Sequence, residues 1–328
     1  MPSGVDIVGF GPIGRELAKR LVSEKELKSK FTIVSISDSS SRVYPRNATE
    51  VLKAVESKSV GHKLSQVNFG KRALKDSSIF IDLTSSNYKK AAEAKNRAIS
   101  ALSDGKHFVS ASKVALSNSF SEIFSFAKER ELEIGFGATI CGGRHAISVA
   151  KNIENGEIKS VYAILNASTT LILSMLEEDQ YLSFDDACKK AAETGVLESD
   201  WSIDLDGIDA AAKTAILGNV LFPESSFSLS DVAIRGIRDA KAKVLIADNR
   251  ARPDTRVRLV AEITQNKISV EPKVVPANSP LAVKGRFNVV LFSTKTLGEI
   301  SVRNLGGGVG LTASVVISDL KRISSIQK

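Results

Sequence analysis

The sequence predicts an α/β protein of two domains: a Rossmann-type parallel-sheet nucleotide domain and an α+β domain. Three observations support this. The first part of the chain alternates β-branched runs with amphipathic stretches, and a glycine-rich turn joins the first run to the first such stretch. The pattern then changes at about residue 140. A length of 328 residues also exceeds one ordinary domain, so two are expected.

Strands are predicted in the first part wherever short apolar, β-branched runs occur, at Val5–Val8, Thr32–Ser37, Ile79–Thr84, His107–Ser110 and Glu133–Phe136. Helices are predicted where apolar residues recur every three or four positions, over Arg15–Val22, Lys89–Ser103 and Ser119–Glu131. Strands that alternate with helices favour a parallel sheet covered by helices. We expect this domain to span residues 1–139.

The second part begins with predicted helices, over Thr170–Glu178, Phe184–Glu193 and Ile208–Leu221. Alternating strands follow, at Arg256–Ile263, Lys267–Val270, Asn288–Phe292 and Glu299–Val302. This order is typical of a sheet with helices on one face, and it predicts an α+β domain over residues 140–303. One amphipathic helix, over Gly310–Ile326, ends the pattern.

Composition argues against several classes of protein. Apolar residues make up 43% and charged residues 25%, as in a soluble globular protein, and no apolar run approaches the length of a membrane span. The N-terminus enters a strand almost at once, so no signal peptide is expected. Two cysteines and three histidines favour neither a disulfide framework nor a zinc site, and a cytoplasmic location is expected. The net charge of +8 is spread among acidic residues, which favours a solvated basic surface over a nucleic-acid site.

A glycine-rich turn predicts a dinucleotide site. It lies directly after the first strand and before the first helix, and it consists of Gly9, Phe10, Gly11, Pro12, Ile13 and Gly14. Its three glycines permit a tight turn, a close approach of backbone to a pyrophosphate, and close packing of helix on strand. The helix N-terminus would face the phosphates. The alternative is a purely structural turn.

Asp38 follows the second predicted strand. A carboxylate at this place can accept hydrogen bonds from both ribose hydroxyls of NAD and repels a 2′-phosphate, so the sequence favours NAD over NADP. Two alternatives remain: Asp38 caps a serine-rich turn, or Arg42 bends back towards a phosphate.

Five carboxylates occur within twelve residues, just before a predicted helix. They are Glu198, Asp200, Asp204, Asp206 and Asp209. Asp206 is predicted to cap the helix, which places Asp209 and Lys213 one turn apart on one face. Reduction of an aldehyde needs a proton donor beside the oxygen, and a lysine kept charged by a carboxylate can supply it. An exposed ion pair is the alternative, although the apolar neighbours favour a buried face.

The segment Gly195–Lys213 resembles the signature of homoserine dehydrogenases, G-Y-x-E-x-D-P-x-x-D-x-x-G-x-D-A-x-x-K. The resemblance extends through the chain: to the glycine-rich turn, to Ser110–Lys113, Asn166–Thr170 and Asn278–Ala282, and to the glycines 306–308 before the last helix. It implies reversible hydride transfer between NAD(P)H and L-aspartate 4-semialdehyde, giving L-homoserine, on the route to threonine, methionine and isoleucine. It also implies that residues 304–328 return to the nucleotide domain and that the chain forms a homodimer through the second domain's sheet.

The same resemblance implies residue roles. Lys213 would be the proton donor, Asp209 would bind the substrate hydroxyl, Glu198 would hold its amino group, and Lys113 would lie near the reacting centre. The remaining substrate ligands would be Asp204, Asn166 and Thr169. The cofactor would be lined, beyond the glycine-rich turn and Asp38, by Thr84, Ser85, Ser112, Lys113, Gly195 and Gly307.

The chain departs from the family pattern in two places. Trp201 replaces the usual proline, and Gly137 and His145 replace a glutamate and a proline around a loop that often binds a monovalent cation such as sodium. Backbone carbonyls could still serve there, from Gly137, Ile140, Gly142 and Arg144, and the alternative is an ordinary inter-domain turn. Neither a kinase nor a regulatory domain is expected in 328 residues.

Two other functions remain open from the sequence. One is a related dehydrogenase acting on a different small substrate, and the other is a cofactor-binding regulatory protein without catalysis. The second would require loss of a proton donor, whereas Lys213 is present.

Overall fold

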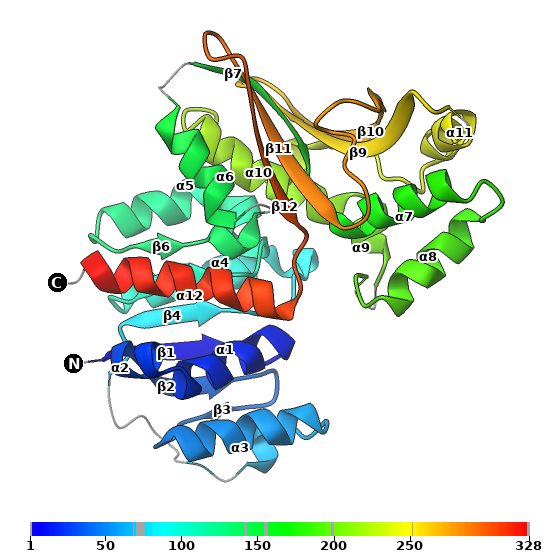
Figure 1. The fold of residues 1–328 in the computed structure, drawn as a ribbon. Coiled ribbons are helices and arrows are strands. Elements are labelled where there is room, and N and C mark those ends of the chain that lie inside the picture. The colour runs from blue at the N-terminus through cyan, green and yellow to red at the C-terminus, as the bar shows by residue number, and fades with distance from the viewer. Residues whose placement is uncertain are drawn as a thin grey trace. The chain divides into compact units, whose positions relative to one another are not determined.

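Figure 1 shows the fold as a computed structural model. It describes residues 2–67, 69, 76–140, 143–153, 157–197, 200–250 and 252–326, without the side chains of residues 143 and 144. The chain divides into two compact units, Met1–Thr139 with Gly308–Lys328, and Ile140–Gly307. The C-terminal return begins at Gly308, later than the expected residue 304, because strand β12 (Glu299–Leu305) continues the sheet of the second unit.

A six-stranded sheet forms the centre of the first unit in the part of the chain described, in the order β3-β2-β1-β4-β5-β6. Its strands are β1 (Ser3–Val8), β2 (Phe31–Ser37), β3 (Arg42–Val43), β4 (Ile79–Asp82), β5 (His107–Ser110) and β6 (Ile134–Gly135). All neighbours pair in parallel except β3, which is antiparallel to β2. The predicted parallel sheet is therefore confirmed, and the segments after β1, β2, β4 and β5 meet at its carboxyl edge, where doubly wound folds bind ligands.

Helices cover both faces of this sheet (Figure 1). They are α1 (Pro12–Ser23), α2 (Lys25–Lys30), α3 (Ala48–Ser59), α4 (Ala91–Ser103), α5 (Val114–Lys128) and α12 (Val309–Ile326), with 3-10 turns η1 (Leu64–Gln66), η2 (Tyr88–Lys90) and η3 (Gly137–Thr139). Helix α12 packs against α1, and both contribute to the apolar core with β1 and β2. The buried Asp319 of α12 accepts a hydrogen bond from the Gly137 N–H at 2.8 Å. This bond connects the last helix to η3, which follows β6.

The second unit contains a sheet in the order β12-β11-β7-β9-β10-β8 among the residues described. Its other strands are β7 (Ile158–Ile164), β8 (Ala233–Ile234), β9 (Thr255–Ile263), β10 (Ile268–Pro276) and β11 (Phe287–Thr294). The helices are α6 (Gly143–Asn152), α7 (Ala167–Glu178), α8 (Phe184–Glu193), α9 (Ser202–Leu205), α10 (Ile208–Leu221) and α11 (Ala240–Asn249), with η4 (Leu229–Asp231). Helices α7, α10 and α11 pack on the sheet, as an α+β domain requires.

Several elements have no counterpart among the predicted ones, chiefly β7, α3, α6 and α11. Strand β7 is central to its sheet, but Lys159 and Ser160 interrupt its apolar pattern. Helix α5 begins at Val114, directly after Lys113, and not at Ser119, which has non-helical backbone angles inside the helix. Among the helices described, none combines the length and apolar character needed to span a bilayer.

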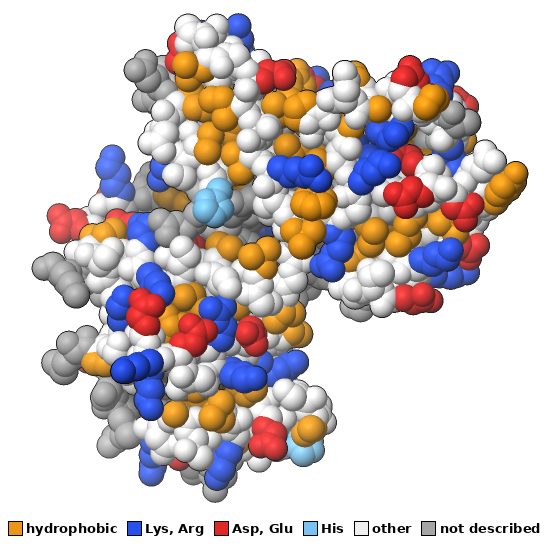
Figure 2. Space-filling view, in the orientation of Figure 1, with side chains coloured by type: hydrophobic (Ala, Val, Ile, Leu, Met, Phe, Trp, Pro, Cys, Tyr) orange, Lys and Arg blue, Asp and Glu red, His pale blue; other side chains and the backbone are white. Residues whose placement is uncertain are grey.

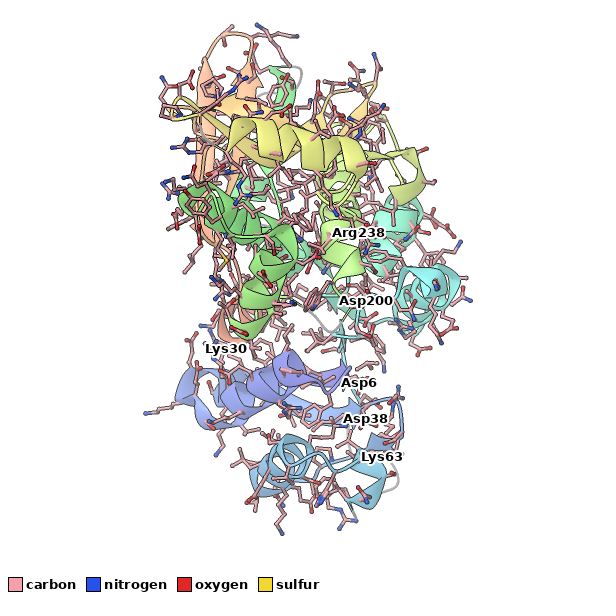
Figure 3. All side chains as sticks on the ribbon, turned by 90° about the vertical axis from the view of Figure 1, so that its right-hand side faces the viewer. Asp6, Lys30, Asp38, Lys63, Asp200 and Arg238 are labelled. Atoms are coloured by element: carbon pink, nitrogen blue, oxygen red, sulfur yellow. The ribbon has the colours of Figure 1, made fainter. Side chains whose placement is uncertain are left out.

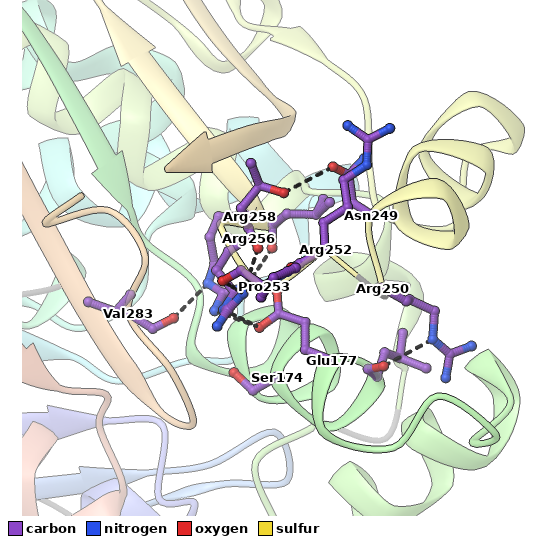
Figure 4. A network of polar contacts seen from close by, with 12 residues as sticks. Ser174, Glu177, Asn249, Arg250, Arg252, Pro253, Arg256, Arg258 and Val283 are labelled. Atoms are coloured by element: carbon purple, nitrogen blue, oxygen red, sulfur yellow. Dashed lines mark hydrogen bonds and ion pairs between the residues drawn. The ribbon is translucent and has the colours of Figure 1, made fainter. Parts of the chain in front are cut away.

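A buried arginine ties α7 to the sheet. Arg258 of β9 has no exposed surface, and its two terminal nitrogens donate to the two carboxylate oxygens of Glu177 near the end of α7 (Figure 4). Its Nε donates to the Val283 backbone oxygen at 2.6 Å. Arg250 donates in addition to the backbone oxygens of Leu176, Asp179 and Leu182. The carboxyl end of α7 is therefore fixed by complementary charges and hydrogen bonds.

Candidate active site

The glycine-rich turn has the geometry that a dinucleotide needs. Gly9 has a φ of +95°, and a Cβ at this position would lie 2.4 Å from the Leu83 backbone. A Cβ on Gly14 would lie 2.4 Å from the Gly9 backbone oxygen, so α1 can approach β1 only because residue 14 has no side chain. A Cβ on Gly11, by contrast, would meet nothing within 4 Å.

Helix α1 begins at Pro12 without a side-chain cap at Gly11, and its first turn carries no acidic residue. The N–H groups of its first turn have no carbonyl partner within the helix, and they form a ready site for anions. Open space at Gly11 and this uncapped helix end fit the pyrophosphate of NAD(P).

Asp38, the predicted ribose ligand, is occupied by the protein's own donors. One carboxylate oxygen accepts from the backbone N–H of Ser40 at 2.8 Å and of Ser41 at 3.1 Å, and the other lies 2.8 Å from Lys58 Nζ. The Leu64 N–H also donates to Asp38. Figure 3 labels Asp38 and Lys63, the residue that precedes Leu64. Burial opposes ionisation, but the hydrogen bonds from Lys58 and Ser40 lower the pKa of Asp38 below its usual range. Asp38 therefore caps the serine-rich turn that follows it, which was one of the two alternatives to a ribose ligand.

The loop after β4 is held by a buried carboxylate. Asp82 has no exposed surface, and its Oδ1 accepts from both the N–H and the hydroxyl of Thr84, at 2.9 and 2.6 Å. Arg97 of α4 donates to Asp82 at 3.3 Å and to the Thr84 hydroxyl at 3.0 Å. The residues predicted to line the cofactor here all follow β4 or β5, and they are Thr84, Ser85, Ser112 and Lys113.

Asp209 and Lys213 form the predicted ion pair in the second unit. Asp209 lies in the first turn of α10, and its Oδ2 is 2.7 Å from Lys213 Nζ. The two side chains are only 13% and 15% exposed, and Lys213 also donates to the Leu165 backbone oxygen at 2.8 Å. An exposed surface pair is therefore excluded for these residues.

Asn166 joins this pair to a second carboxylate. Its Nδ2 donates to Asp204 Oδ1 at 2.6 Å and to Asp209 Oδ2 at 3.1 Å. Burial and the nearby Asp209 carboxylate raise the pKa of Asp204 to about 6. A buried carboxylate with a raised pKa beside another carboxylate and a lysine is typical of a functional site. The structure thus brings together Asn166, Asp204, Asp209 and Lys213, with Thr169 hydrogen-bonded to Asn166.

Asp206 does not cap α10, contrary to the prediction. The N-cap is Gly207, with a φ of +82° and no side-chain cap, while Asp206 ends the short helix α9. A left-handed residue is needed to turn directly from one helix into the next, and glycine adopts it without strain. Asp206 instead accepts hydrogen bonds from Nε and Nη2 of Arg238, which Figure 3 labels.

The contacts described do not connect the remaining predicted site residues to this cluster. Glu198 and Gly142 lie outside the described residues. Gly195 and Gly307 belong to the second unit, while Gly137 lies in the first and Ile140 begins the second. Arg144 is in the first turn of α6, where helical geometry directs its carbonyl to an N–H four residues later and argues against a cation ligand. Among the described residues, no group of three acidic, histidine or cysteine side chains is placed to hold a metal ion.

Four residues that contact the candidate site had no clear signal in the sequence. Lys58 is one of many lysines, on a helix that was not predicted, and Arg97 is one polar residue on an amphipathic helix. Leu165 acts through its backbone oxygen, which no side-chain pattern reveals. Arg238 is distant from Asp206 in sequence. Only the need of a buried carboxylate, Asp38 or Asp82, for a distant base could have pointed to Lys58 and Arg97.

Comparison with known proteins gives a consistent result. The family model described as homoserine dehydrogenase matches residues 146–320, and that of its NAD binding domain matches residues 9–136. The homoserine dehydrogenases of Methanocaldococcus jannaschii and Pyrococcus horikoshii are 32% and 33% identical, over 98% of this chain and 98% and 97% of theirs. A solved hyperthermophilic archaeal homoserine dehydrogenase in complex with NADPH is 30% identical, with a TM-score of 0.80 over 100% of this chain and 99% of that one.

Proposed function

Since the chain belongs to the homoserine dehydrogenase family, we propose that the buried Asp209–Lys213 pair carries out the proton transfer of that family's reaction. The reaction is reversible hydride transfer between NAD(P)H and L-aspartate 4-semialdehyde, giving L-homoserine. The observation that carries the proposal is the 2.7 Å contact of Asp209 with Lys213, removed from bulk solvent at the start of α10.

Lys213 donates the proton in the direction of reduction. As hydride reaches the carbonyl carbon, the carbonyl oxygen gains negative charge, and the ammonium of Lys213 neutralises it by transferring one proton. Asp209 keeps the lysine charged before transfer, and the Leu165 backbone oxygen fixes the direction of Nζ. In the reverse direction, neutral Lys213 takes the hydroxyl proton of homoserine.

The substrate's ammonium group calls for negative charge, which Asp204 and Glu198 supply in the proposed arrangement. Asp204 is 8% exposed, and it lies on the same hydrogen-bond network as Asp209. Asp209 orients the reacting hydroxyl. Lys113, which immediately precedes α5, would act near the reacting centre, as the family resemblance implies.

NAD(P) supplies the hydride acceptor or donor when it is bound. The turn from Gly9 to Gly14 and the N-terminus of α1 would hold its pyrophosphate, and Thr84, Ser85 and Ser112 would line the cofactor after β4 and β5. The family resemblance adds Gly195 and Gly307 to this set. We also propose that NAD is used at least as well as NADP, because Asp38 directly follows β2 and a carboxylate there suits the ribose hydroxyls of NAD. Its pairing with Lys58 weakens the repulsion of a 2′-phosphate, so NADP is accepted too.

Two further features belong to the proposal. A monovalent cation would be held by the backbone carbonyls of Gly137, Ile140 and Gly142. A homodimer would form through the sheet of the second unit, where the edge strand β12 has alternating exposed residues and Leu305 is 55% exposed. Figure 2 shows apolar side chains among lysines and arginines over the area of β11 and β12. A cytoplasmic location accords with the buried free thiol of Cys188.

The proposal is tested by following nicotinamide absorbance with L-homoserine and each cofactor, with and without sodium, on protein whose mass in solution is measured by light scattering. We expect homoserine-dependent reduction of both cofactors by a dimer. Absence of turnover with homoserine, while another hydroxy amino acid is oxidised, would overturn the proposed substrate.

A further inference from the structure

The amide of Asn166 lies between two carboxylates. Its two N–H groups reach Asp204 Oδ1 at 2.6 Å and Asp209 Oδ2 at 3.1 Å, and the residue is 4% exposed. Asp204 comes from α9 and Asp209 from α10, whereas Asn166 caps α7. One side chain therefore connects three helices at the point where their acidic groups meet.

The orientation of this amide is fixed by its surroundings. The Thr169 N–H can only donate, and it lies 2.9 Å from Asn166 Oδ1, which also accepts from the hydroxyl of Ser168 at 2.6 Å. The carbonyl side of the amide must therefore face the start of α7, and the NH₂ side must face the carboxylates. Both N–H groups and the oxygen of Asn166 are thus engaged within the protein, so the side chain has no polar group left for a substrate.

The two carboxylates would repel one another without a donor between them. The groups that face Asp204 are Asn166 and Ser168 from α7, and Asp209 and Lys213 from α10. Burial and Asp209 favour its protonated form, and the hydrogen bond from Asn166 and the charge of Lys213 oppose this effect. Asn166 is the uncharged member of this set that donates to both carboxylates at once.

We propose that Asn166 is a positioning residue, whose amide bridges Asp204 and Asp209 so that both stay ionised at the pH where the enzyme works. This rests on the proposed function, in which Asp204 must be charged to hold the substrate's ammonium group and Asp209 to hold Lys213. It replaces the role predicted from the sequence, in which Asn166 binds the substrate directly.

Two substitutions separate the bridge from the helix cap. Serine also caps helices, so Asn166→Ser keeps the oxygen acceptor for the start of α7 but removes the donor to the carboxylates. Asn166→Asp keeps the shape and the acceptor but places a third carboxylate among them. Asn47→Ser is the matched control, because Asn47 caps α3 in the same way, through the Glu50 N–H, without bridging carboxylates.

The measurements are the pH profile of kcat/KM for homoserine and the titration of Asp204 by carboxyl carbon NMR without substrate, assigned with Asp204→Asn. In Asn166→Ser, we expect the acidic limb of the profile and the titration midpoint of Asp204 both to move up by about one pH unit. Asn166→Asp should move both midpoints further, and Asn47→Ser should move neither.

An Asn166→Ser protein that is folded and has an unchanged Asp204 midpoint would overturn the bridge. A raised KM with an unchanged pH profile would restore the role in substrate binding. If the wild type has no activity with homoserine, the proposed function fails, and the NMR titration still decides on the bridge. If Asn166→Ser does not fold, Asn166→Thr, which also caps helices without an amide donor, gives the same readout.

Discussion

Helix α7 has a buried cluster of charged groups at each end, and the two clusters differ in kind. At its carboxyl end, Glu177 meets the fully buried Arg258, and opposite charges are matched by hydrogen bonds. At its amino end, Asp204 and Asp209 lie together with Lys213 as the cation facing them, and Asn166 lies between the acids. In the first cluster, the carboxylate has hydrogen-bonding partners of opposite charge within the fold. In the second cluster, two groups of like charge lie close together.

This difference indicates different purposes. A matched buried pair holds α7 against β9, and loss of one partner would leave an uncompensated charge inside the protein. Burial and the neighbouring Asp209 shift the pKa of Asp204 upwards, an arrangement that reduces stability and is common where chemistry takes place. We therefore expect substitutions at the amino end of α7 to change catalysis, and those at the carboxyl end to change stability.

The largest effect is expected for Lys213→Ala. The variant should lose kcat by roughly 10²–10⁴-fold, the usual worth of a positioned general acid, because the developing alkoxide loses its proton donor. KM should change much less, since the interaction forms mainly in the transition state. Steady-state kinetics with homoserine checks this.

The control for that variant is Lys189→Ala, which removes an exposed lysine paired with Asp186 on α8. It should leave turnover unchanged and have almost no effect on stability. A folded Lys213→Ala protein with kcat within about threefold of the wild type would contradict the catalytic role.

The next effect concerns the other end of α7. Arg258→Ala should lower the free energy of unfolding by about 3 kcal/mol, because Glu177 would lose its two hydrogen bonds from Arg258 in the protein interior and keep only Arg256, at 3.5 Å, as a cation. Urea unfolding followed by the fluorescence of Trp201, the chain's single tryptophan, reports on this unit. Turnover of the folded fraction should be nearly normal. Arg258→Met with Glu177→Leu should recover much of the lost stability, and failure to do so would count against a purely structural pair.

The smallest effect is expected in the nucleotide unit, at Lys58. Lys58→Ala leaves Asp38 without its cation, so the charge of Asp38 acts more strongly on a 2′-phosphate. Affinity for NADP should fall by about tenfold, equivalent to about 1.4 kcal/mol, while affinity for NAD changes little. Cofactor titrations check this, with Lys53→Ala, on the same helix, as the control. An equal loss for both cofactors would show that the pair only supports the fold.

The sequence predicts features that depend on residues close together in the chain. It does not predict contacts between residues that are brought together only by folding. The turn from Gly9 to Gly14 and the Asp209–Lys213 spacing lie within single turns, so their geometry follows from the chain itself. The pairing of Asp38 with Lys58 depends on a helix whose position only the fold determines.

The contacts of Asn166 within the protein likewise depend on residues that are distant in the sequence. The structure shows that its side chain caps α7, which begins at Ala167 and not at the predicted Thr170. Its second set of partners, Asp204 and Asp209, comes from elements that approach it only after folding. A polar residue in a family motif therefore cannot be assigned to the substrate until its contacts within the protein are known.

The amino end of α7 holds its acids together at the expense of stability. Folding raises the pKa of Asp204 to about 6, so the folded protein binds this proton more tightly than the unfolded chain. The associated stability is fully present below the ordinary pKa of about 4 and is lost as the pH rises through about 6. Above that, the ionised carboxylate destabilises the fold by an amount on the order of 3 kcal/mol.

The most direct test is the difference in unfolding free energy between Asp204→Asn and the wild type, measured by Trp201 fluorescence from about pH 4 to about pH 8. Asparagine keeps the shape of the side chain and cannot ionise. We expect the variant to be the more stable protein at about pH 8, this advantage to disappear towards about pH 4, and turnover of homoserine to be lost. A variant that is less stable at the higher pH, or whose difference from the wild type does not change with pH, would contradict this expectation.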